Sequence, residues 1–108
     1  MVKQGCIILV DFDPQLGHEQ KGRLPALVIS NDLFNKYSEM SIVCPITNTE
    51  KNHPLHVKLD AKTKTTGVIL CDQIKTMDIK VRNFKILESV PEEILDNVLD
   101  IVFSLMEK

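Results

Sequence analysis

Residues 17–30 read Gly-His-Glu-Gln-Lys-Gly-Arg-Leu-Pro-Ala-Leu-Val-Ile-Ser, a polar turn that runs directly into an apolar strand. A short, nearly continuous apolar run over residues 5–11 precedes it, so the pattern predicts two strands joined by a loop. The loop carries an imidazole, a carboxylate, an amide and a guanidinium within six residues. A loop can bring such groups together and a rigid strand can hold them still, which is what a functional site needs.

The rest of the chain predicts a mostly β, antiparallel domain with a terminal helix. Strands are expected over residues 5–11, 26–30, 40–47, 55–59, 67–74 and 84–88, and a helical turn over 33–36 after the capping residues Asn31 and Asp32. Proline lacks a backbone donor, so regular pairing should begin after Pro25, and Pro45 should mark an edge or a bulge.

The C-terminal segment predicts a helix whose apolar side chains recur at helical spacing from Ile94 to Met106. We expect Ser89 or Val90 to cap it, Pro91 to lie in its first turn, and the following glutamates to complement the helix dipole. Such a wide apolar stripe packs against the sheet or against a partner.

Bulk composition predicts one domain over residues 1–108, of ordinary globular character, since 44% of residues are hydrophobic and 26% charged. No apolar run approaches the ~18 residues of a membrane span, and the N-terminus lacks the apolar region of a signal peptide. The cysteines, Cys6, Cys44 and Cys71, are odd in number and flanked by apolar residues. We interpret them as reduced core thiols of a cytoplasmic protein.

The net charge of −2 is unevenly distributed along the chain. Residues 51–88 hold eight Lys and Arg against four Asp and Glu, whereas residues 89–108 hold one against five. This pattern is typical either of a solvated surface or of a local positive face that attracts a polyanion.

A metal site is not expected. His53 and His56 stand three residues apart, and such positions in a strand face opposite ways. No cysteine joins them at ligand spacing. Cleavage within RNA, in contrast, needs no metal, because the adjacent 2′-hydroxyl can act as the nucleophile. It needs a base, an acid and fixed donors for the charge that develops on phosphorus. Glu19 or His18 can serve as the base, an arginine can grip the phosphate, and Thr47 can donate a hydrogen bond.

The order and spacing of several short motifs along nearly the whole chain resemble the MazF/PemK family of bacterial toxins, which are sequence-specific ribonucleases of toxin–antitoxin pairs. The motifs are Gly17-His18-Glu19-Gln20, Pro25 to Ser30, Cys44-Pro45-Ile46-Thr47-Asn48, Thr65-Thr66-Gly67-Val68, Asp72-Gln73-Ile74-Lys75-Thr76-Met77-Asp78 and Val90-Pro91-Glu92-Glu93. The block from Asp72 to Asp78 is most similar to the Kid-like branch.

The resemblance implies an SH3-like antiparallel barrel with a C-terminal helix (CcdB/Kid/MazF-like). It implies a homodimer without cofactor that cuts single-stranded mRNA, leaving a 2′,3′-cyclic phosphate and a 5′-hydroxyl. The implied protein partner is a cognate antitoxin, whose disordered acidic and apolar tail occupies the same groove. The implied catalytic positions are Glu19, Arg23 or Leu24, and Thr47. The implied RNA-binding residues are His18, Gln20, Asn48, Lys51, Gln73, Lys75 and Asp78, with Lys75 in an arginine's place and Asp78 supplying an aspartate.

Leu24 departs from the family pattern, because it stands where the family carries its pre-proline arginine. Leucine can neither donate a proton nor hold a phosphate. Arg23 is its neighbour, but adjacent residues in an extended chain point to opposite sides. The sequence therefore leaves open whether Arg23 substitutes or the protein is impaired. It also leaves open two other classes, a non-catalytic module that binds antitoxin or RNA and a CcdB-like gyrase poison.

Overall fold

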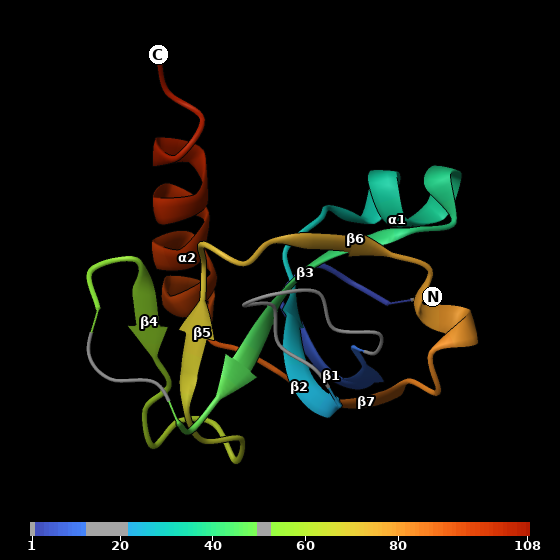
Figure 1. The fold of residues 1–108 in the computed structure, drawn as a ribbon, viewed down its shortest axis with the longest axis horizontal. Coiled ribbons are helices and arrows are strands. Elements are labelled where there is room, and N and C mark those ends of the chain that lie inside the picture. The colour runs from blue at the N-terminus through green and yellow to red at the C-terminus, as the bar shows by residue number, and fades with distance from the viewer. Residues whose placement is uncertain (1, 13–21, 50–52) are drawn as a thin grey trace.

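The computed structural model describes residues 2–12, 22–49 and 53–108 (Figure 1). These ranges form a twisted antiparallel sheet, with one long helix against it and one short helix at its far end (Figure 1). None of their helices is long and apolar enough to cross a membrane. The elements are β1 (Cys6–Asp11), β2 (Arg23–Val28), α1 (Asp32–Ser38), β3 (Ser41–Thr47), β4 (His56–Lys58), β5 (Val68–Leu70), β6 (Lys75–Met77), the 3-10 helix η1 (Ile79–Val81), β7 (Lys85–Ser89) and α2 (Glu92–Ser104).

Strand β3 is the centre of the sheet. On one side, residues 43–45 of β3 pair with β2. On the other side, residues 41–43 pair with β6 and residues 46–47 pair with β5. The strand order is β4-β5-β3-β2-β1-β7, and every pairing is antiparallel. The mostly β architecture with a C-terminal helix is therefore confirmed.

Both faces of the sheet are buried, which explains the continuous apolar runs in β1 and β2. Ile7 and Leu27 belong to a first apolar cluster, which the buried face of α2 covers. Their neighbours Ile8 and Val28 belong to a second cluster on the opposite face. Because successive side chains of a strand point to opposite faces, each strand must be apolar throughout. Burying one such side chain contributes about 1.5–3 kcal/mol.

Helix α2 follows the expected apolar stripe, but its start was predicted wrongly. Ile94, Val98 and Val102 are its buried residues. The N-cap is Pro91, which makes no side-chain cap, rather than Ser89 or Val90. Ser89 is instead the last residue of β7, so its backbone is committed to the sheet. The glutamates that follow Pro91 lie in the first turn, as expected from the helix dipole.

The two strand prolines lie where a neighbouring strand is missing. Strand β2 begins at Arg23, so the prediction that pairing starts after Pro25 was wrong. Pro25 pairs with Leu9 of β1, but β3 pairs only with residues 26–28 of β2, so this stretch of β2 has one neighbour. Pro45 lies in the central strand, not at an edge. It falls between the residues of β3 that pair with β6 and those that pair with β5.

The strand predicted over residues 67–74 is shorter than expected, since only β5 lies within that range, and β6 was not predicted. β5 ends at Leu70 and β6 begins at Lys75, with a turn between them in which the Gln73 N–H donates to the Leu70 carbonyl at 3.1 Å. The short helix α1 is longer than expected, but its cap was predicted correctly. The Asn31 side chain accepts a hydrogen bond from the Phe34 N–H at 2.8 Å.

The cysteines Cys6, Cys44 and Cys71 are free and buried, as expected for core thiols. Burial is the main cause that raises the pKa of all three, and it raises the pKa of Cys71 to about 11. Since the thiolate is the reactive form, these thiols are poor nucleophiles at neutral pH.

Gly67 lets β5 begin directly beside the end of β3. Its φ is +121°, and a Cβ there would lie 2.7 Å from the Thr47 carbonyl oxygen and 3.0 Å from the carbonyl carbon. Both are backbone atoms, so no side-chain rotation can relieve the contact.

We expect Gly67→Ala to lower the free energy of unfolding by about 1–3 kcal/mol, measured by urea denaturation. Gly22→Ala is the matched control, because Gly22 has a φ of +83° but nothing within 4 Å of a Cβ. A Gly67→Ala effect no larger than that of the control would contradict the close approach.

Glu88 ties the loop before β5 to strand β7. Its carboxylate accepts hydrogen bonds from the Lys64 N–H, the Thr65 N–H and the Thr65 hydroxyl, at 3.1, 2.7 and 2.7 Å. The Thr65 hydroxyl is the largest cause that lowers the pKa of Glu88.

We expect Glu88→Gln to lower the free energy of unfolding at pH 7, and the difference from the parent protein to shrink on acidification. The contribution is present above the unfolded-state pKa, about 4.3, and is lost as the pH falls through the lower folded-state pKa. The exposed Glu107→Gln is the control in the same pH series. If the difference in the free energy of unfolding between Glu88→Gln and the parent protein stayed constant down to low pH, the stabilising role of the ionised Glu88 carboxylate would be refuted.

Candidate functional site

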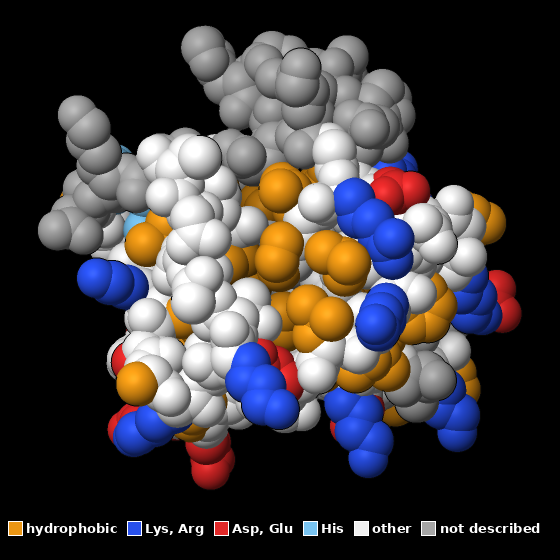
Figure 2. Space-filling model, turned by 90° about the horizontal axis from the view of Figure 1, so that it is seen from below, with side chains coloured by type: hydrophobic (Ala, Val, Ile, Leu, Met, Phe, Trp, Pro, Cys, Tyr) orange, Lys and Arg blue, Asp and Glu red, His pale blue; other side chains and the backbone are white. Residues whose placement is uncertain are grey.

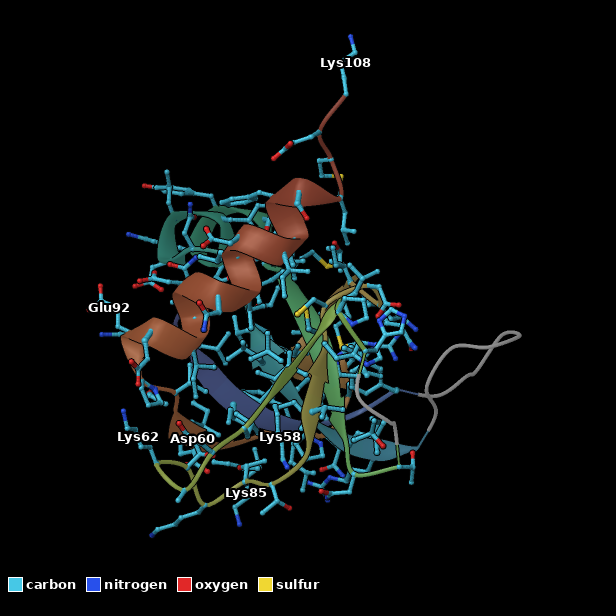
Figure 3. The ribbon with its side chains drawn as sticks, turned by 90° about the vertical axis from the view of Figure 1, so that its left-hand side faces the viewer. Lys58, Asp60, Lys62, Lys85, Glu92 and Lys108 are labelled. Carbon is cyan, nitrogen blue, oxygen red and sulfur yellow. The ribbon has the colours of Figure 1, made fainter. Side chains whose placement is uncertain are left out.

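The end of β3 opens onto a hollow of about 580 Å³. Thr47 ends the strand there, and Asn48 follows it in the next turn. Figure 3 shows Lys58 and Asp60, which also line the hollow, towards the end of the molecule away from Lys108. The lining residues are Thr47, Asn48, Lys58, Leu59, Asp60, Ala61, Thr63, Thr66, Gly67 and Val68. The hollow is therefore rich in hydroxyl, amide and charged groups.

The Thr47 side chain is fixed by the turn that follows it. The residue is 8% exposed. Its hydroxyl oxygen accepts from the Thr49 N–H at 3.2 Å and lies 2.9 Å from the Thr49 hydroxyl oxygen. Either hydroxyl can be the donor of that pair. Thr47 thus has a structural role as an acceptor, and its hydroxyl proton is free for a ligand in the arrangement in which the Thr49 hydroxyl donates.

Leu24 and Thr47 each lie two residues beyond the last pair between β2 and β3. That pair is Ala26 with Pro45, and the pairing of the two strands ends there. Side chains two apart share a face, so Leu24 and Thr47 lie on the same face. Leu24 is partly buried and packs against the second apolar cluster. The two positions that the resemblance implies as catalytic therefore lie on one face of the sheet, each just beyond the paired part of its strand.

Arg23 lies on the opposite face from Leu24. It pairs with Asp11 of β1, and its Nη2 donates to the Asn83 carbonyl at 3.2 Å. Asn83 belongs to the turn between η1 and β7 and has a φ of +54°. Alternation along β2 sets the two residues on opposite faces, and the Arg23 guanidinium is engaged by a backbone carbonyl.

The predicted residues of the Asp72–Asp78 block are spread along the sheet. Lys75 pairs with Val43, four residues before Thr47 and on the same face by alternation. Gln73 lies in the turn before β6. Asp78 lies beyond Met77, which pairs with Ser41 at the other end of β3, about 20 Å from Thr47 at 3.3 Å per residue.

Asp78 has a local structural role instead. Its carboxylate caps η1 by accepting from the Lys80 N–H at 3.2 Å. The structure therefore does not bring Asp78 to the Thr47 hollow. The remaining predicted residues, His18, Glu19, Gln20 and Lys51, lie outside the described residues.

The expectation that His53 and His56 face opposite ways was wrong. Their ring centroids are 4.6 Å apart, with an angle of 31° between the planes. The rule of alternation does not apply because His53 precedes β4, and the His56 N–H closes a turn onto the His53 carbonyl at 3.0 Å. Across the described ranges, no three His, Cys, Asp or Glu side chains gather as a metal site would require.

The sequence analysis did not place Asp72 and Lys58 near the face of the sheet that carries Thr47. Asp72 accepts from His56 Nε2 at 3.1 Å. The position of Lys58 was predictable from the alternation of polar and apolar residues. His56 and Lys58 alternate with Val57 and Leu59, which pack on the first apolar cluster. That period of two places His56 and Lys58 on the other face, with Thr47.

The chain is similar to one family of proteins along nearly its whole length. The sequence profile of the PemK-like, MazF-like toxins of type II toxin–antitoxin systems matches residues 3–105. Endoribonuclease PemK of Escherichia coli is 41% identical over 102 residues, which cover 91% of this chain and 77% of that protein. Endoribonuclease EndoA of Bacillus subtilis (strain 168) is 38% identical over 103 residues, covering 91% and 88%.

Solved structures of the same class share the fold. MazF from Deinococcus radiodurans superposes with a TM-score of 0.91 at 34% identity, covering 97% of this chain and 96% of that one. A MazE–MazF structure from the same organism gives 0.82 at 28% identity, covering 97% and 94%. The chain belongs to the PemK-like, MazF-like toxin family of type II toxin–antitoxin systems.

We expect Thr47→Val to destabilise the protein by about 1 kcal/mol in urea denaturation, because the Thr49 N–H loses its acceptor. The exposed Thr66→Val is the control on the same hollow. Equal stability of the two variants would show that the Thr47 hydroxyl has no structural role.

Proposed function

We propose that this protein is a toxin that cuts single-stranded RNA without a metal ion, and that Leu24 strongly impairs it. The products are a 2′,3′-cyclic phosphate and a 5′-hydroxyl. The observation that supports the proposal is the register of β2 and β3, in which residue 24 and Thr47 each lie two residues beyond the last pair, together with the polar hollow that Thr47 lines. Relatives at 38–41% identity that are named endoribonucleases support it.

The chemistry follows from the substrate. The ribose 2′-oxygen attacks the adjacent phosphorus as a base removes its proton, and the bond from phosphorus to the 5′-oxygen breaks as that oxygen gains a proton. His18 or Glu19 is the proposed base. The Thr47 hydroxyl and Lys58 stabilise the phosphate, and Asn48 lines the same hollow. The other proposed RNA contacts are Gln20, Lys51, Gln73 and Lys75.

Leu24 removes the donor that this arrangement requires. A preorganised donor at the developing charge is worth about 10²–10³ in rate. Arg23 is a poor substitute, because its guanidinium is held on the opposite face by the Asn83 carbonyl. This partly buried leucine also favours a second candidate, a module that binds RNA or antitoxin without cutting.

We also propose a homodimer that binds an antitoxin. The MazE–MazF structure supports the antitoxin. Figure 2 shows apolar side chains gathered at the centre of one face, with lysine and arginine side chains around them, which suits an acidic, apolar antitoxin tail. Large exposed apolar side chains elsewhere suit an interface between copies, and they include Leu33, Tyr37, Phe103 and Met106.

We expect Leu24→Arg to raise RNA cleavage by about 10²–10³, because it restores a charged donor on the face of Thr47. The measurement is incubation of a fluorescent RNA in EDTA, with products resolved on a gel and the cyclic phosphate identified by mass. Leu24→Gln is the matched control, since it is polar and of similar size but carries no charge, and both variants are checked by thermal melting.

The outcomes separate the candidates. Strong cleavage by the parent chain that Arg23→Ala abolishes would refute the impairment. RNA binding without cleavage in all forms would favour the non-catalytic module. Stalling of gyrase on DNA with no effect on RNA would favour the gyrase poison.

A further inference from the structure

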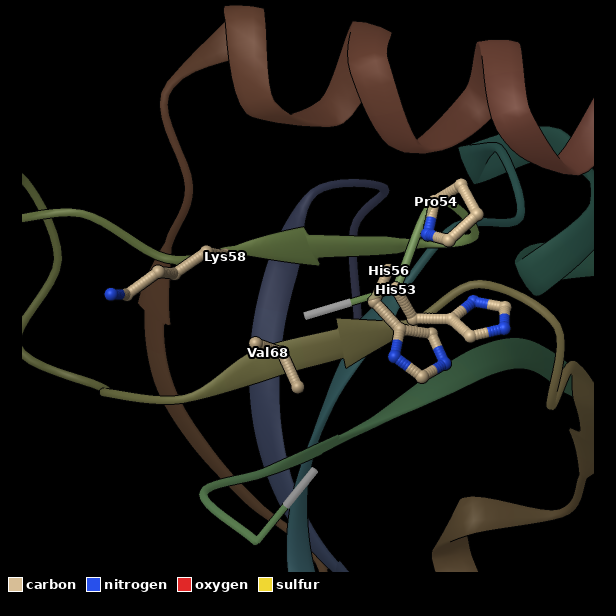
Figure 4. A pocket seen from close by; sticks show the side chains of 5 residues that line it. All are labelled: His53, Pro54, His56, Lys58 and Val68. Carbon is tan, nitrogen blue, oxygen red and sulfur yellow. The ribbon is translucent and has the colours of Figure 1, made fainter. Parts of the chain in front are cut away.

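A pocket of about 220 Å³ lies between α1, the start of β3 and η1. It is at the opposite end of β3 from the Thr47 hollow and from the histidine-lined pocket of the β4–β5 hairpin (Figure 4). None of its described lining residues belongs to the RNA site proposed above. The pocket therefore needs an explanation of its own.

The walls of this pocket are apolar. Val2 and Ile79 are buried and belong to the second apolar cluster. Met40 and Phe84 are more exposed and add two further apolar side chains. Pockets for drug-sized ligands have volumes of about 300–1,000 Å³, so this smaller pocket suits an apolar group of the size of one amino-acid side chain.

Two buried polar side chains also line the pocket, and they differ in their hydrogen bonds. The Asn35 carboxamide is engaged within the protein, since its Nδ2 donates to the carbonyls of Val2 and Ser30 and its Oδ1 accepts from the Ser30 hydroxyl. Ser41 is 3% exposed, and no described residue forms a hydrogen bond with its hydroxyl. This hydroxyl is available to a ligand.

Three charged side chains line the same small pocket. Lys36 and Glu39 are three residues apart at the end of α1, and Lys80 lies on η1. Lys36 Nζ lies 5.4 Å from the centroid of the Tyr37 ring. The charged groups of Glu39 and Lys80 form no ion pair with any described residue. Two positive charges and one negative charge are thus exposed to a ligand at the pocket.

Glu39 occupies a position that favours glycine. It is the C-cap of α1, and its φ of +59° lies in the left-handed region, where glycine is the usual residue at a helix end. The end of the helix therefore does not account for a carboxylate at this place.

The three charges restrict the chemistry of the ligand. An apolar carboxylate would be attracted by the lysines but repelled by Glu39, and an apolar amine would be attracted by Glu39 but repelled by both lysines. A molecule that carries a carboxylate and an ammonium group beside one apolar side chain has a partner for every charge. A free amino acid with an apolar side chain has this chemistry.

We propose that this pocket binds a free amino acid with an apolar side chain, such as leucine. The side chain of the ligand packs against the apolar walls. Its carboxylate pairs with Lys36 and Lys80 and accepts from the Ser41 hydroxyl, and its ammonium group pairs with Glu39. The inference is independent of the proposed RNA cleavage.

The test follows the backbone amide NMR spectrum of the parent chain during titration with L-leucine at pH 7. Two further probes each lack one charged group, since L-leucinamide has no carboxylate and 4-methylpentanoate has no ammonium group. We expect L-leucine to shift the amides that line the pocket in a saturable way. Each of the other probes should bind about tenfold more weakly, because one charge-assisted contact is lost.

Variants assign the charges. Glu39→Gln should weaken binding of L-leucine about tenfold without weakening that of 4-methylpentanoate, and Lys80→Gln should reduce the preference for L-leucine over L-leucinamide. Ser41→Ala should weaken binding of L-leucine about 2- to 10-fold. Glu107→Gln and Lys108→Gln are the matched controls, since they remove the same charges at the end of the chain. Thermal melting checks that each variant is folded.

Three results would overturn the proposal. The first is no saturable binding of L-leucine by the parent chain, or shifts confined to amides outside the pocket. The second is binding of L-leucinamide or 4-methylpentanoate as tight as that of L-leucine, because the pocket would then not use both charges. The third is an equal loss of binding in Glu39→Gln and Glu107→Gln, which would show an effect of net charge alone.

Discussion

The whole arrangement depends on the sharing of β3 among three neighbouring strands. One edge of this strand pairs with β2, and the other edge is divided between β6 and β5. The division places the last residues of β3 beside β5, where only a glycine at 67 allows so close an approach. It also aligns Thr47 with Val68 and Lys58 in a row, so the polar hollow follows directly from strand pairing.

Strand alternation then explains why one replacement matters more than the others. Two neighbours in β2 point to opposite faces, and only position 24 shares the face of Thr47. Arg23 retains the charge in the sequence but carries it to the Asn83 carbonyl on the other side. In the proposed mechanism, a lysine at 75 keeps its charge on the face of Thr47 but loses the planar shape of an arginine. A leucine at 24 lacks the hydrogen-bond donor that this mechanism requires.

Much of the fold was predictable because local patterns and tertiary packing agree. The stripe of α2, the Asn31 cap and the apolar strands all followed from spacing, since each element needs that pattern to bury its own face. The errors came where a neighbour decides the structure. Pro25 and Pro45 are tolerated inside strands because no neighbouring strand pairs with β2 or β3 at those points, which no local pattern reveals.

The candidate site was likewise predictable in part from the sequence and in part only from the tertiary structure. The resemblance to a known family named Thr47 and position 24. The contact between His56 and Asp72, sixteen residues apart, came only from the pairing of β4 with β5. Asp78 was assigned to the site by its motif, yet β6 carries it to the far end of β3. The sequence by itself determined the elements and the chemical groups, because propensity and periodicity are local properties. Only the tertiary structure decided which groups meet, because strand register couples residues that no local pattern connects.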